Sequence, residues 1–135
     1  MKNVFRTIVS ILVFFLAVNI NLYAAGSEKD TIVTLDSDVA DFANPFAFKA
    51  LVGDTVQFVS INGEFAILIR YADKFFLDVG HTIKIHLNDG DVSEMYFVKS
   101  ELPIDTEIKY EVYCITQNRW ADAPPRIIIV PHDEY

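Results

Sequence analysis

The sequence predicts an all-β protein of about seven to nine short strands, arranged as an antiparallel sandwich or barrel. Three observations support this fold class. Runs rich in β-branched and aromatic residues alternate between two faces. Turn residues separate these runs at intervals of about ten residues. No segment after residue 24 keeps the helical period of about 3.6 residues.

The first half of the β-region contains four expected strands, at residues 31–35, 46–51, 55–61 and 64–71. Residues 36–45 (DSDVADFANP) are expected to form a loop, which the Asn-Pro pair closes. The fourth strand alternates clearly, with one face formed by Phe65, Ile67, Ile69 and Tyr71 and the other by Glu64, Ala66, Leu68 and Arg70. Asn62-Gly63 is typical of a tight hairpin turn between the third and fourth strands.

The second half predicts strands at residues 75–79, 81–87, 93–98, 106–114 and 126–130. In HTIKIHL, alternation separates His81, Ile83, Ile85 and Leu87 from Thr82, Lys84 and His86. Residues 88–91 (NDGD) predict a second hairpin turn. A long connection, residues 115–125, leads to the last strand.

The N-terminal segment has the pattern of a secretory signal peptide. Lys2 and Arg6 precede an apolar run at residues 8–18, and Leu22-Tyr23-Ala24 forms a small-residue cleavage site. The run is shorter than the roughly 20 apolar residues of a membrane-spanning helix. We therefore expect a signal peptide at residues 1–24 and a single domain at residues 25–135, exported to the periplasm or secreted. A buried N-terminal helix or a short anchor is the alternative.

The charge of the chain disfavours two classes of partner. The formal net charge is −8, and removal of Lys2 and Arg6 with the signal peptide, which contains no acid, makes it −10. Nucleic acids and anionic lipids bind clustered Lys and Arg residues, so we expect neither as a partner. Asp36, Asp38 and Asp41 are the densest group of acids, but their spacing does not match a calcium-binding loop. No membrane span is expected after removal of the signal peptide.

The sequence lacks the motifs of several common enzyme classes. It contains no G-x-S-x-G motif, no glycine-rich phosphate loop and no H-E-x-x-H motif. Its single cysteine, Cys114, has no partner for an internal disulfide. We therefore expect a protein that is not an enzyme.

Three blocks of the sequence resemble cupredoxins. In NPFAFKALVGDTVQFVSI (residues 44–61), residues 53–58 fit the G-D-x-V-x-F pattern of the family's first block. IKYEVYC (residues 108–114) is similar to the strand that ends in the copper-binding cysteine of plastocyanin-like members, and RIIIV (residues 126–130) resembles the final strand. The resemblance implies a cupredoxin-like, Greek-key β-sandwich.

The resemblance also implies the position of a copper site, where most ligands are missing. A blue copper site uses two imidazoles, one thiolate and usually an axial thioether. Cys114 stands at the thiolate position, but Gln117 stands where the family carries a histidine, and residues 115–125 contain no methionine. The segment expected to carry the family's first histidine, SINGEFAILI, contains none. The resemblance therefore implies a domain without a functional copper site and without a cofactor.

Three hypotheses remain for Cys114. It packs as a small apolar residue, it is a reactive thiol, or it belongs to an atypical metal site. Arg119 would supply the positive charge that activates a thiol. The metal hypothesis needs irregular backbone, because His81 and His86 are expected on opposite faces of a strand and His132 lies in the C-terminal tail.

Trp120 lies in the loop that rims the metal in cupredoxins. We expect its indole to fill the space of the missing ligands, or alternatively to project as a candidate contact for a partner. Phe42, Phe75 and Phe76 are expected to pack in the core or under loops.

The predicted function is that of an exported, non-catalytic, cupredoxin-like domain that binds an unknown protein partner or supports an assembly of the cell envelope. One alternative is an atypical copper-handling or electron-transfer protein that uses Cys114. Another is an immunoglobulin-like adhesion domain, although the paired cysteines of that class are missing.

Overall fold

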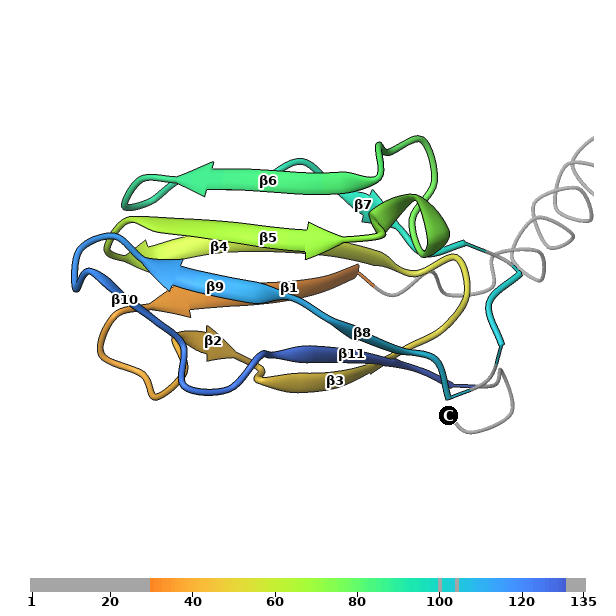
Figure 1. Cartoon of the computed structure of the whole chain (residues 1–135), viewed down its shortest axis with the longest axis horizontal. Helices are drawn as coiled ribbons and strands as arrows, with labels where there is room; N and C mark the ends of the chain where they lie inside the picture. Colours follow the sequence, from red (N-terminus) through yellow and green to blue (C-terminus); the bar gives the residue numbers. More distant parts are fainter. Residues whose placement is uncertain (1–29, 100, 104, 131–135) are drawn as a thin grey trace, which may run out of the picture.

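The computed structural model describes residues 30–99, 101–103 and 105–130, which are mainly β-structure (Figure 1). The predicted signal peptide and His132 lie outside the described residues. Within them, eleven strand segments occur in this order: β1 (Asp30–Asp36), β2 (Ala43–Asn44), β3 (Ala47–Ala50), β4 (Thr55–Asn62), β5 (Phe65–Arg70), β6 (Thr82–Leu87), β7 (Tyr96–Phe97), β8 (Glu107–Lys109), β9 (Glu111–Cys114), β10 (Arg119–Trp120) and β11 (Arg126–Ile129). A 3-10 turn, η1 (Ala72–Lys74), lies between β5 and β6. Among these residues, no helix has the length and apolar character needed to cross a membrane.

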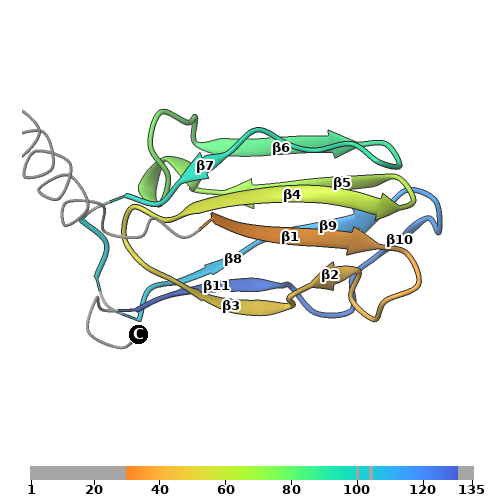
Figure 2. The same ribbon diagram turned by 180° about the vertical axis from the view of Figure 1, so that it is seen from behind.

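The strands form two layers that pack face to face. One layer is the sheet β2-β1-β4-β7, which is nearest the viewer in Figure 2. The other layer contains the sheets β10-β9-β5-β6 and β3-β11-β8. These two sheets form one continuous layer. β8 belongs to one sheet and β9 to the other, and the chain runs from β8 into β9 in the same direction with only Tyr110 between them (Figure 1). The all-β sandwich predicted from the sequence is therefore confirmed.

The number of strand segments exceeds the predicted seven to nine for two reasons. The predicted strand 106–114 is divided at Tyr110 into β8 and β9. In addition, β2 and β10 are two-residue segments inside the expected loops 36–45 and 115–125. Pairing with a longer neighbour defines each of them: β2 pairs with β1, and β10 pairs with β9.

Neither predicted hairpin turn joins two paired strands. Asn62-Gly63 leads from β4 to β5, and residues 88–91 lead from β6 to β7, but in each case the two strands lie in different sheets. The turns themselves form, with φ of 107° at Gly63 and 84° at Gly90. They carry the chain across the sandwich instead of back along one sheet. The sheets also include two parallel pairs, β1 with β4 and β3 with β11, where an antiparallel arrangement is predicted.

The predicted strand at residues 75–79 does not form. The segment follows η1, and its pairing is a single isolated bridge between Phe76 and Val98. Phe75 packs against the core and its neighbour Phe76 is fully buried. Two consecutive residues that both contact the core are incompatible with the alternating faces of a strand. The expectation that these aromatics pack in the core is confirmed.

Tyr71 and His81 lie on the surface, although alternation groups each of them with strand residues that are buried. The reason is that β5 ends at Arg70 and β6 begins at Thr82, so both residues lie just outside the extended backbone to which alternation applies. Their rings contact each other edge-on, with 4.8 Å between centroids. Within β5 and β6 the predicted alternation is confirmed.

The inward faces of the two layers share one hydrophobic core. Its largest fully buried side chains include Tyr110, Phe42, Phe58, Phe65 and Phe76. Burial of this apolar surface is the main contribution that stabilises a domain of this size. The core extends to Cys114 at the end of β9.

Candidate functional site

Cys114 is fully buried at the end of β9. Its cross-strand neighbours are Phe65 of β5 and Arg119 of β10. Phe65 contacts Phe42, with 5.8 Å between ring centroids. The guanidinium carbon of Arg119 lies 4.2 Å from the centroid of the Phe42 ring. Cys114 therefore belongs to an apolar cluster, as the packing hypothesis requires. The guanidinium of Arg119 lies at the edge of this cluster.

Polar side chains near Cys114 join the loops at this end of the sandwich. Nε2 of Gln117 donates to the carbonyl of Ser37 at 2.6 Å, and Oε1 of Gln117 accepts from Nε of Arg119 at 3.0 Å. Oγ1 of Thr116 accepts from the N–H of Glu64 at 2.8 Å. Gln117, which stands where the resemblance to cupredoxins implies a histidine, thus connects the loop after β1 to the segment between β9 and β10.

The acids Asp36, Asp38 and Asp41 also hold loops in place. Nδ2 of Asn62 donates to Oδ1 of Asp36 at 2.8 Å and to Oδ2 of Asp38 at 3.0 Å. Oδ1 of Asp41 accepts from the N–H of Ala123 at 3.0 Å. These carboxylates connect the loop after β1 to the turn before β5 and to the loop before β11.

The described residues around Cys114 do not form a blue copper site. A blue copper site places two imidazoles beside the thiolate, whereas the residues paired with Cys114 are a phenylalanine and an arginine. His86 contacts Glu64, with 2.6 Å from Nε2 to Oε1, and His81 contacts Asp73, with 3.1 Å from Nδ1 to Oδ1. In the part of the chain that the structure describes, no three His, Cys, Asp or Glu side chains are placed to share a metal ion.

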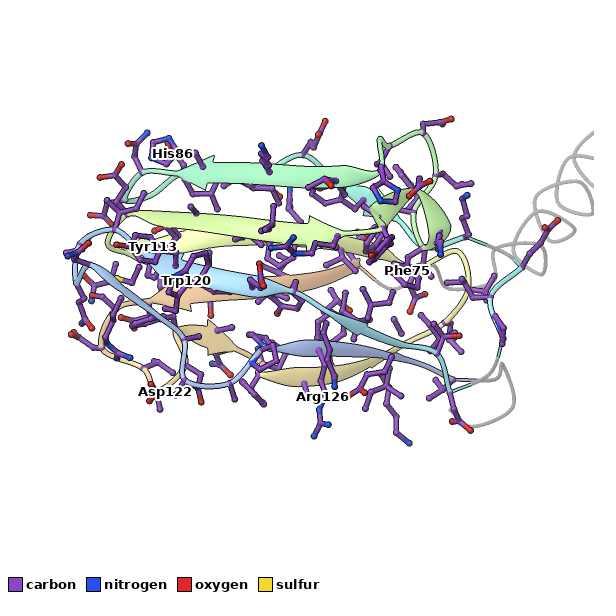
Figure 3. The ribbon with its side chains drawn as sticks, viewed as in Figure 1. Phe75, His86, Tyr113, Trp120, Asp122 and Arg126 are labelled. Carbon is purple, nitrogen blue, oxygen red and sulfur yellow. The ribbon has the colours of Figure 1, made fainter. Side chains whose placement is uncertain are left out.

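Trp120 does not fill the space beside Cys114, so that expectation is wrong. Its side chain is 55 % exposed. Arg119 is opposite Cys114 and contacts the buried Phe42 ring, so alternation turns the next residue, Trp120, to the outer face of the sheet. There the indole packs on Tyr113, with 4.9 Å between centroids and 59° between planes (Figure 3).

The outer face of the sheet β10-β9-β5-β6 presents its side chains in rows across the strands. One row consists of Trp120, Tyr113, Ala66 and His86, each opposite the next in register. The adjacent row consists of Glu111, Leu68 and Lys84. Alternation places these residues of β5 and β6 on one face, but it does not place them beside Trp120. Strand order supplies that information.

Trp120 lines two hollows on this face, and we call them together the Trp120 groove. The larger has a volume of about 510 Å³, and its lining includes Leu68, Arg70, Glu111, Trp120, Ala121 and Pro124. The smaller has a volume of about 300 Å³, and its lining includes Ala66, Leu68, Lys84, Ile85, His86 and Trp120. Sites for small molecules are commonly concave and mostly apolar, with a few polar groups at the rim. The Trp120 groove has this character.

The charged side chains at the rim of the groove include pairs of opposite sign. Nη2 of Arg70 lies 3.4 Å from Oε2 of Glu111, and Nε2 of His86 lies 2.6 Å from Oε1 of Glu64. With Lys84, the rim has two permanent cations and two carboxylates, so it is close to neutral when His86 is uncharged. This local balance differs from the net charge of −8 of the whole chain.

No family model and no curated protein matches the chain. Among solved structures, it is similar to a reduced Cu(I) form of an amicyanin mutant, with 11 % identity and a TM-score of 0.43 over 78 % of this chain and 87 % of that chain. It is also similar to a purple cupredoxin from Nitrosopumilus maritimus, with 19 % identity and a TM-score of 0.41 over 74 % of this chain and 99 % of that chain. At TM-scores this low, the similarities carry no argument about function. The assignment of a β-sandwich rests on the strand pairing itself.

Proposed function

We propose that the chain is an exported, non-catalytic β-sandwich module that binds a partner through the Trp120 groove. The observation that carries this proposal is the exposed indole of Trp120, which lines two hollows of an ordered sheet face. Trp, Tyr and Arg are the residue types that most often dominate the binding energy of interfaces. Trp120 and Tyr113 lie together on this face (Figure 3), and Arg70 lines the larger hollow beside Trp120.

The rigidity of the sheet supports a binding role. Tyr113, Ala66 and His86 stand on strands that pair with one another, and Trp120 pairs with Tyr113. Side chains that are already held in place lose less conformational entropy when a partner binds. The contact surface is therefore organised in advance.

The surroundings of Cys114 support a non-catalytic role. A nucleophilic thiol must meet its substrate, whereas Cys114 is fully buried beside Phe65 and Arg119.

Two parallel strand pairs also distinguish this sandwich from the antiparallel sheets of immunoglobulin domains. Export is supported by the signal-peptide pattern of residues 1–24.

Binding of fractionated envelope material to the immobilised exported protein tests the proposal. Protein and polysaccharide fractions from the native source are applied separately, and the bound mass is measured by biolayer interferometry. Phe97→Ala is the matched control, because Phe97 is an aromatic residue with 45 % exposure on β7 of the other layer. We expect Trp120→Ala to lose most of the binding and Phe97→Ala to retain it. Equal binding by Trp120→Ala and the unmodified protein would refute the groove as the contact surface.

N-terminal sequencing of protein recovered outside the cytoplasm tests export. The expected first residue is Ala25, directly after the predicted cleavage site. Recovery of all the protein inside the cytoplasm with residues 1–24 attached would contradict export.

A further inference from the structure

The indole of Trp120 offers a flat apolar surface in the middle of the groove. Tyr113 packs against it, and the side chain still keeps 55 % of its area exposed. The face of an aromatic ring is electron-rich, so it attracts weakly positive C–H groups that lie flat upon it. The two hollows share Trp120 and Leu68 but are otherwise lined by different residues, so a ligand on the indole has room to continue into both. The shape therefore fits an elongated ligand built of ring units.

The charged side chains at the rim of the groove offer both donors and acceptors, and two pairs of them are in contact, Arg70 with Glu111 and His86 with Glu64. Arg70 and Lys84 only donate hydrogen bonds, and ionised Glu111 and Glu64 only accept them. Arg70 is paired with Glu111 at 3.4 Å. A hydroxyl group donates and accepts, so neighbouring hydroxyls bond both members of such a pair without disturbing its charge balance. A charged ligand would instead lie beside a like charge at one member of each pair. The rim thus fits a ligand that is neutral and rich in hydroxyl groups.

The position of the groove on a sheet face disfavours a peptide. β5 pairs with β6 on one side and with β9 on the other, so its backbone groups bond to those neighbours and not to a molecule on the outer face. A peptide that crosses this face would bring an N–H and a C=O group at nearly every residue. Each such group that is buried without a partner is unfavourable. A saccharide has no amide backbone to satisfy.

We propose that the Trp120 groove binds a neutral oligosaccharide, with one sugar ring stacked on the indole and neighbouring rings in the two hollows. This inference rests on the proposed function, because it names the ligand class of the same surface. Arg70, Glu111, Lys84 and His86 hydrogen-bond the hydroxyl groups along the rim. Leu68 forms an apolar floor shared by both hollows.

Tryptophan fluorescence provides a direct test, because Trp120 is the only tryptophan in the chain. The exported protein is titrated with the neutral hexasaccharides cellohexaose, hexa-N-acetylchitohexaose, maltohexaose and mannohexaose. The charged comparisons are an oligogalacturonate and hexaglutamate. At least one neutral hexasaccharide is expected to shift the emission saturably, with a dissociation constant in the millimolar range or below.

Three variants locate the binding. Ala66→Leu narrows the smaller hollow but keeps the indole, so fluorescence still reports on binding, and the affinity is expected to fall at least about tenfold. Trp120→Ala is measured by calorimetry, with a loss of at least the same size. Phe97→Ala, on the other layer, is expected to bind as the unmodified protein does. Circular dichroism spectra identical to that of the unmodified protein confirm that each variant is folded.

The outcomes separate the two proposals. A saturable response to a neutral hexasaccharide that Ala66→Leu weakens supports the inference. A response only to oligogalacturonate or hexaglutamate, or none to any neutral sugar at millimolar concentration, overturns it. The envelope-fraction experiment judges the proposed function independently. If Trp120→Ala abolishes binding of a protein fraction while no neutral sugar binds, the groove remains a binding surface and the saccharide is rejected.

Discussion

Tyr110 has a buried hydroxyl group without a hydrogen-bond partner among the described residues. Its side chain is 1 % exposed, and its ring packs edge-on against Phe58 with 5.3 Å between centroids. Burial raises the pKa of this phenol, because desolvation disfavours the charged phenolate. The ring therefore stabilises the core, while the hydroxyl group opposes folding through its lost hydration.

Tyr110→Phe is expected to stabilise the protein by about 1 kcal/mol. The substitution keeps the ring and its contact with Phe58 and removes only the hydroxyl group. Burying an unpartnered hydroxyl costs roughly 1–3 kcal/mol. The small cavity left by one oxygen atom offsets roughly 0.5 kcal/mol of this gain. For a domain of about 100 residues, a net 1 kcal/mol raises the Tm by about 4–8 °C.

Urea unfolding followed by far-ultraviolet circular dichroism measures this effect. Tyr96→Phe is the matched control, because Tyr96 is also buried but its hydroxyl donates to Oε1 of Glu94 at 3.3 Å. The control is expected to lose about 0.5–1.5 kcal/mol, so the two substitutions have opposite signs. A loss of about 1 kcal/mol or more in Tyr110→Phe would refute the reasoning, since it would show that an ordered water satisfies the hydroxyl.

Three further predictions concern the turn before β5, the buried thiol and the alkaline limit of stability. Gly63→Ala is expected to destabilise the protein by about 1 kcal/mol or more. The φ angle of Gly63 is 107°, and the new Cβ atom would lie 3.2 Å from Oγ1 of Thr116. An unchanged midpoint of urea unfolding would contradict this prediction. Cys114 is expected to react with a thiol reagent only after unfolding, and Cys114→Ser is expected to be less stable than Cys114→Ala because a hydroxyl in this apolar cluster is costly. Rapid labelling of the native protein would show that the thiol is accessible. Burial raises the pKa of Tyr96 to about 12 and raises that of Tyr110 as well, so both stay protonated in the folded protein while they ionise near pH 10 in the unfolded chain. The unfolded state then binds fewer protons, and the free energy of unfolding is expected to fall as the pH rises from about 10 toward 12; urea titrations that show a constant value across this range would disprove the assignment.

Alternation along single strands could be predicted from the sequence. Phe65, Ile67 and Ile69 of β5 lie on one shared, buried face, as alternation predicts, and the predicted turn residue Gly63 has a positive φ. These properties depend on neighbours a few residues apart, so the local sequence contains the information.

The pairing of strands could not be predicted in the same way. A turn signal such as Asn62-Gly63 sets backbone angles, but it does not specify whether the next strand returns in the same sheet or crosses to the other. β4 and β5 each have one apolar face, and placing them in opposite layers buries both faces against each other. The crossing is favoured because it removes more apolar surface from water than an isolated hairpin does.

For the candidate site too, the sequence predicts the local position of single residues, whereas the tertiary structure decides which residues become neighbours. From the sequence alone, Cys114 is assigned to a strand end without the usual copper ligands, and Trp120 to the loop that follows. The exposure of Trp120 results from the register that sets Arg119 opposite Cys114, and the groove results from the strand order β10-β9-β5-β6. Register and strand order join residues that are far apart in the chain. They are set by the packing of the whole core, and so they become visible only when the chain is folded.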